Sequence, residues 1–159
     1  MVPTRPSAAY GVVQVNVAVN IKASLDQVWK ALIDETSAWW PRDFYTSTAT
    51  KGFHIEPRLG GRVYEDWGHE AGLLWFTVIG INPPNSLTLL GYLTPAFGGP
   101  ATTTLELNLK SMGETVTLQV TETVSGRADA KMEATLRDGW LAIFDAGLRA
   151  YVEGKAHHS

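Results

Sequence analysis

The longest regular pattern of apolar residues lies near the C-terminus, between Ala128 and Glu153. Apolar side chains recur there at every third or fourth position, which is the spacing of one face of an α-helix. The pattern predicts one long amphipathic helix, whose apolar face carries Met132, Leu136, Trp140, Ile143, Phe144, Gly147 and Tyr151.

Gly147 falls near the middle of this apolar face, although glycine inside a helix costs about 1 kcal/mol relative to alanine. Two explanations are open. In the first, a neighbouring aromatic side chain or another stretch of backbone packs against the glycine. In the second, the missing side chain leaves room for part of a ligand cavity beneath the helix.

The N-terminal part of the chain follows a different period. Apolar and polar residues alternate over residues 13–21, which predicts a β-strand with one buried face. The alternation then stops at Ser24, which forms a capping-box pattern with Gln27 and predicts a short helix. A second short helix is predicted within residues 35–40, before a proline.

Six further strands are predicted, separated by glycine, proline and asparagine turn signals, over residues 54–56, 62–67, 74–81, 86–92, 102–110 and 114–123. Their short connections are typical of an antiparallel sheet. The last two strands each have one apolar face, which the C-terminal helix is long enough to cover. The predicted fold class is therefore α+β, with a curved antiparallel sheet of about seven strands wrapped around a long C-terminal helix and two short helices after the first strand.

The composition of the 159 residues is that of one globular domain, 45% hydrophobic and 18% charged. We expect a flexible leader at 1–11, the domain at 12–153 and a polar tail at 154–159. The net charge of −3 without a basic cluster argues against a nucleic-acid partner, and no apolar run approaches the roughly 20 residues of a membrane helix. The sequence has no cysteine and no signal-peptide pattern, so we expect a cytoplasmic protein.

Three stretches carry a resemblance to a known family: the helix start at Ser24–Trp29, the segment Glu56–Glu65 (EPRLGGRVYE), and Gly139-Trp140 in the closing helix. With the order of elements, they resemble the SRPBCC superfamily, the helix-grip fold of START domains and birch-pollen allergens. Within it the chain is most similar to the branch of heat-shock chaperone ATPase activator homologues. The resemblance covers residues 12–153 and implies a cavity between helix and sheet, which in many members holds a hydrophobic small molecule.

Aromatic side chains are the first candidates to line such a cavity, because they offer large apolar contact area and can stack on rings. The alternative for each tryptophan is ordinary core packing, and for the loop histidine a solvated position. The candidate ligand-binding residues are Trp40, Trp67, His69, Trp75, Tyr92, Trp140, Phe144 and Gly147.

Two glutamates are candidates for acid–base chemistry. Strand alternation places Glu65 on the face of Val63, and Glu122 on the face of Val120, so both carboxyl groups would point into an apolar interior. A carboxyl group buried in this way suits proton transfer or hydrogen bonding to a ligand. The alternatives are a solvated rim position or an ion pair with an arginine, and a single β-bulge would reverse the direction of Glu65.

The predicted function is binding of a small hydrophobic or aromatic ligand between the sheet and the C-terminal helix. The alternative is an enzyme of the cyclase or dehydratase kind that uses Glu65 or Glu122 as acid and base. A role as chaperone ATPase co-regulator is expected least, because eukaryotic activators carry an additional N-terminal domain that this sequence lacks. The histidines and carboxylates lack metal-site spacing, so no metal or cofactor is expected, and the sequence is compatible with a homodimer.

Overall fold

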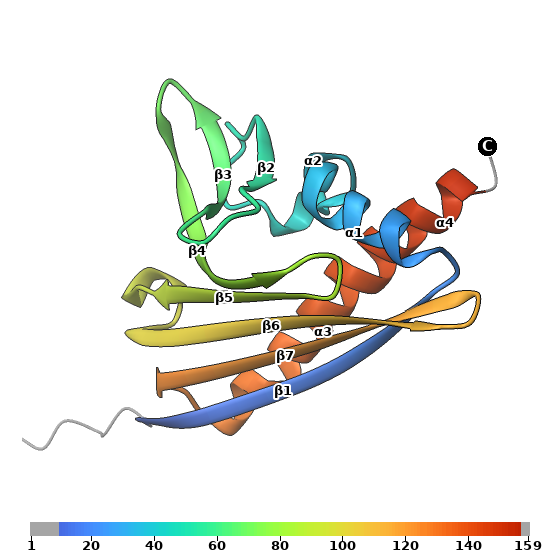
Figure 1. Ribbon diagram of the computed structural model, residues 1–159. Coiled ribbons are helices and arrows are strands. Elements are labelled where there is room, and N and C mark those ends of the chain that lie inside the picture. Colours follow the sequence, from blue (N-terminus) through green and yellow to red (C-terminus); the bar gives the residue numbers. More distant parts are fainter. Residues whose placement is uncertain (1–9, 157–159) are drawn as a thin grey trace, which may run out of the picture.

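One antiparallel sheet of seven strands dominates the computed structural model, which describes residues 10–156 (Figure 1). Neighbouring strands follow the order β1-β7-β6-β5-β4-β3-β2. The first two strands in the chain thus lie at opposite edges of the sheet. The bounds are β1 (Tyr10–Ile21), β2 (Gly52–Ile55), β3 (Arg62–Gly68), β4 (Ala71–Asn82), β5 (Ser86–Leu93), β6 (Ala101–Met112) and β7 (Thr115–Arg127).

Two short helices, α1 (Leu25–Asp34) and α2 (Thr36–Trp39), connect β1 to β2. The capping box predicted at the start of α1 is present, since the Ser24 hydroxyl accepts from the Gln27 amide and the Gln27 side chain accepts from the Ser24 amide. A single 3-10 turn at Arg42–Phe44 follows α2. The connection between α2 and β2 otherwise has no regular structure, and we call residues 41–51 the entrance segment.

The C-terminal helix consists of α3 (Ala130–Leu141), a wider π-helical stretch (Ala142–Arg149) and α4 (Ala150–Ala156). In Figure 1 it passes diagonally behind β5, β6, β7 and β1, and its end lies beside α1. Lys155 at that end donates to Glu35 at the end of α1, with 2.7 Å between the nitrogen and the oxygen. The helix thus spans the sheet and meets the first helix at its far side.

The core lies between the sheet and this helix. The alternating apolar residues of β6 and β7 are buried, among them Leu105, Leu107, Leu118 and Val120. Trp140, Ile143, Phe144 and Leu148 of the C-terminal helix cover them and are buried as well. The predicted helix-grip fold is therefore confirmed.

The ends of the domain differ slightly from the expected boundaries. Tyr10 and Gly11 pair with Arg127 and Gly126 in the sheet, so these two residues belong to β1 and not to a leader. Likewise α4 continues to Ala156, three residues into the expected tail. The rest of the expected leader and tail, residues 1–9 and 157–159, lies outside the described residues. None of the described helices combines the length and apolarity that crossing a membrane requires.

Candidate functional site

Aromatic side chains fill most of the space between the sheet and the C-terminal helix, where the sequence predicts a ligand cavity. A void of about 20 Å³ remains there, which is about the volume of one water molecule. Besides aliphatic residues of α1 and the strands, it is lined by Trp39, Trp40, Phe53, Phe76, Trp140 and Phe144. The interior is thus a packed apolar core with very little open volume.

The aromatic rings form a continuous row across the interior. Trp40 stacks on Phe53 with 3.8 Å between the ring centroids, and Trp75 meets both rings edge-on. Trp39 links this group to Phe144 of the C-terminal helix, and Phe144 stacks on Trp140 at 5.6 Å. Such ring pairs add stability beyond their buried area, so this row holds the short helices and the long helix together.

Gly147 contacts backbone rather than open volume. A Cβ atom at this position would lie 3.0 Å from the carbonyl oxygen of Trp39 and 3.2 Å from Cγ of Pro41. The glycine therefore lets the end of α2 approach the C-terminal helix closely. This is the packing explanation, and the idea of a ligand gap at Gly147 is corrected accordingly.

Glu122 lies in the interior near the start of the C-terminal helix, 3% exposed. Its carboxyl oxygens accept hydrogen bonds from the Thr103 hydroxyl at 2.5 Å and from Nε1 of Trp140 at 2.7 Å. Burial raises the pKa of Glu122, and the hydrogen bonds from Thr103 and Trp140 oppose this shift. The carboxyl group thus ties β6, β7 and α3 together from within.

Glu65 lies at the other end of the interior and is fully buried. Its two carboxyl oxygens accept hydrogen bonds from the amide and the hydroxyl of Thr46, at 2.9 and 2.7 Å. Nε1 of Trp75 donates to it at 2.8 Å, and Nε1 of Trp67 lies 3.4 Å away. The inward direction of Glu65 agrees with the strand alternation, and the carboxyl group fastens the entrance segment to the sheet through Thr46.

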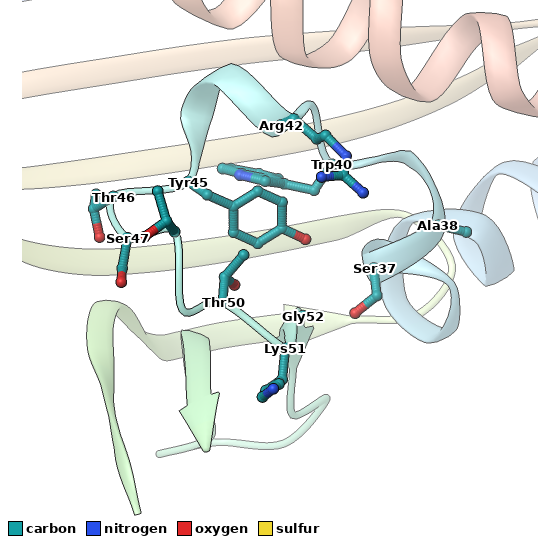
Figure 2. Close-up of a pocket in the computed structure, with 11 residues that line it drawn as sticks. Ser37, Ala38, Trp40, Arg42, Tyr45, Thr46, Ser47, Thr50, Lys51 and Gly52 are labelled. Carbon is teal, nitrogen blue, oxygen red and sulfur yellow. The ribbon is translucent and has the colours of Figure 1, made fainter. Parts of the chain in front are cut away.

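An open cleft of about 700 Å³ lies on the outer side of the entrance segment (Figure 2). Its walls come from α2, the entrance segment and the first residue of β2: Ser37, Ala38, Trp40, Arg42, Tyr45, Thr46, Ser47, Thr48, Thr50, Lys51 and Gly52. Trp40 lines both this cleft and the small interior void, so its indole separates the two.

The remaining predicted ligand-binding residues lie elsewhere. Trp67 is half-buried and occupies an irregular position between two β3–β4 pairs. His69 lies exposed in the β3–β4 turn, with a left-handed backbone φ of 53°. Tyr92 is 60% exposed on β5. Of the predicted set, Trp40 lines the cleft, and the ring of Trp75 contacts the ring of Trp40. Trp140 and Phe144 are buried in the core.

Sequence reasoning missed most of the cleft, because its walls come from a segment without a helical or strand period. The one available signal was the run of hydroxyl residues Thr46, Ser47, Thr48 and Thr50 after the second short helix. Within residues 10–156, no three histidine or acidic side chains come together in a way that would hold a metal ion.

The family model described as Activator of Hsp90 ATPase homolog 1-like protein matches residues 22–153. A comparison with curated proteins found no significant match.

Solved structures of similar fold include three that illustrate its range. DynU16, a protein in the dynemicin biosynthetic locus, is 24% identical over 88% of this chain, with a TM-score of 0.60, and this chain spans 47% of its length. The Aha1 dimer from Colwellia psychrerythraea is 18% identical over 89% of this chain and 96% of its own, with a TM-score of 0.62. Ara h 8.0201 is 14% identical over 91% of this chain and 99% of its own, with a TM-score of 0.67. At these identities the likeness establishes the fold alone.

Proposed function

The chain belongs to the family of Activator of Hsp90 ATPase homolog 1-like proteins, within the SRPBCC superfamily, and on that premise we propose that it binds a small aromatic ligand in the cleft beside Trp40. The volume of about 700 Å³ is within the range of small-molecule sites. The observation that carries the proposal is the position of Trp40, which offers an aromatic wall to the cleft and lies against the apolar interior behind it.

The apolar part of the ligand would pack against the rings of Trp40 and Tyr45. The ring of Tyr45 stands at the centre of the view in Figure 2, between Thr46 and Ser47 on one side and Ser37 and Ala38 of α2 on the other. Aromatic walls bind flat rings by stacking and apolar burial. A longer ligand would reach the interior only by displacing the Trp40 indole from its stack on Phe53.

Binding is better supported than acid–base catalysis by the surroundings of the two glutamates. The oxygens of Glu65 and of Glu122 already accept hydrogen bonds from neighbouring side chains and, for Glu65, from a backbone amide. A general base needs a free oxygen within hydrogen-bond reach of its substrate. The buried carboxyl groups therefore serve best as anchors for the walls of the site.

The test is a titration with 2-naphthamide, a neutral fused-ring probe, followed by NMR of the indole N–H signals and by calorimetry. We expect the Trp40 signal to shift and the Trp140 signal to remain, because only Trp40 lines the cleft. The variant Ala38→Trp adds a bulky side chain to an exposed residue that lines the cleft at α2 and should weaken binding.

The matched control is Ala134→Trp, the same change at an exposed alanine of α3 outside the cleft, which should leave binding unchanged. Unaltered binding in Ala38→Trp, or no binding of naphthyl probes to the original protein, would contradict the proposal.

A further inference from the structure

Positive charge distinguishes the cleft from the rest of the molecule. Arg42 and Lys51 line it, and no lining residue is acidic, although the whole chain has a net charge of −3. Both cations are exposed, and neither forms an ion pair with another described residue. The two cations attract anions, and the nearest carboxyl group, that of Glu65, lies behind the wall and is engaged by Thr46 and Trp75.

Unused hydrogen-bond donors accompany the two cations. The hydroxyl oxygen of Thr50 is buried and has no hydrogen-bond partner within residues 10–156. A buried hydroxyl without a partner is costly, and because this oxygen has almost no accessible surface, a ligand atom would satisfy it only if the entrance segment moved. By contrast, the hydroxyls of Ser37 and Thr46 are already engaged with Phe53 and Glu65.

Tyr45 supplies another donor. Burial raises the pKa of Tyr45, the charge of Glu65 adds to this, and Arg42 opposes it, so the phenol stays protonated at neutral pH. In Figure 2 its hydroxyl points toward the side of the cleft where Arg42 and Ser37 lie. The phenol and the guanidinium can therefore donate to the same acceptor group.

We propose that the cleft recognises an acidic group, so that the ligand is an aromatic or apolar carboxylic acid whose carboxylate is held by Arg42 and Tyr45. This inference rests on the proposed function and names the class of ligand. Arg42 is the main contact because a guanidinium presents paired donors that match the two carboxylate oxygens. Lys51 lies on the opposite side of the cleft from Arg42 in Figure 2, and a change of rotamer in its flexible stem would bring the ammonium group to the opening.

The experiment compares 2-naphthoate with 2-naphthamide, which share a ring system and differ in charge. We expect the carboxylate to bind about tenfold more tightly, the magnitude of one charge-assisted hydrogen bond. Arg42→Gln should remove that difference, and Lys51→Gln should reduce it about threefold, because a lysine acts as a point charge at the rim. Both variants should weaken binding of the amide less than binding of the carboxylate, because the amide carries no charge.

Lys110→Gln is the matched control, since it removes one exposed positive charge on β6 outside the cleft and should change neither affinity. Equal affinity of the two probes, or equal losses in Arg42→Gln and Lys110→Gln, would overturn the acidic-ligand inference and leave the proposed function standing. Failure of both probes to bind would overturn the proposed function together with this inference.

Discussion

Gly147 and Gly154 lie two turns apart on the C-terminal helix and have opposite surroundings. A side chain at Gly147 meets the backbone of Trp39 and the ring of Pro41, whereas a Cβ at Gly154 meets no atom within 4 Å. Alanine and leucine are both better helix formers than glycine, so helix propensity alone would favour replacing either residue. Comparing the same substitution at Gly147 and Gly154 therefore separates the effect of the close contact with α2 from the effect of helix propensity.

Gly147→Leu should therefore lower the free energy of unfolding by about 2 kcal/mol, because the added side chain overpacks the contact with α2. Gly154→Leu should raise it by up to about 1 kcal/mol through helix propensity. Urea unfolding of both variants measures the two changes. A Gly147→Leu protein as stable as Gly154→Leu would show that the close approach does not constrain the helix.

Glu122 gives a prediction for the effect of pH on stability. Its pKa is raised in the folded protein, mainly by burial, so the folded state holds this proton more strongly than the unfolded state does. Protonated Glu122 therefore contributes its full stabilisation below the ordinary glutamate pKa of about 4.3. This contribution is lost as the pH rises through the raised pKa of Glu122 in the folded protein.

Glu122→Gln keeps the shape of the side chain and makes it neutral at every pH. The glutamine amide can still form hydrogen bonds with Thr103 and Trp140. Between pH 4 and pH 8, the free energy of unfolding measured with urea should fall less in the variant than in the original protein. Parallel stability curves for the two proteins would contradict the raised pKa.

The entrance segment is fastened to the sheet at two points, by Thr46 on the side chain of Glu65 and by the backbone amide of Lys51 on the carbonyl of Asp66. Both polar groups of Thr46 donate to Glu65, while the segment otherwise has only a single 3-10 turn. Few backbone hydrogen bonds and much exposed surface make such a segment prone to local opening. The Thr46–Glu65 contact is thus expected to control how often the wall of the cleft opens.

Thr46→Val removes the hydroxyl donor to the fully buried Glu65 carboxyl. The same oxygen keeps its hydrogen bond from Trp75, so the loss should cost about 1 kcal/mol. Amide hydrogen exchange should become faster in residues 42–50 and stay unchanged in β6 and β7. Thr48→Val is the control, because Thr48 is exposed in the same segment and should alter exchange little. Equal exchange in both variants would argue against the Thr46–Glu65 contact as the fastening of the segment.

At the scale of the whole molecule, the sequence predicted the fold well because two clear periods define it. The two-residue alternation in β1, β6 and β7 and the helical period after Ala128 each specify one buried face, and the capping box at Ser24 marks the first helix. These are local signals, and together they indicate that the C-terminal helix covers the apolar face of the sheet.

The candidate site was predicted less completely, because it depends on packing between distant segments. Sequence alone showed many aromatic residues but did not show that Trp40, Phe53 and Trp75 pack on one another and fill the interior. The cleft depends on where an aperiodic segment comes to rest, and Thr46 contacts Glu65 from 19 positions away. Such contacts have no periodic signature.

The close approach of Gly147 to Trp39 and Pro41 has a thermodynamic consequence. Trp40 lies between Trp39 and Pro41 in the chain, so the backbone that carries this wall of the cleft also packs against the C-terminal helix. A ligand that moved Trp40 would also act on the C-terminal helix, and by reciprocity anything that displaced the helix would alter affinity at the cleft. A change in the position of the C-terminal helix would therefore change the affinity of a ligand at the cleft.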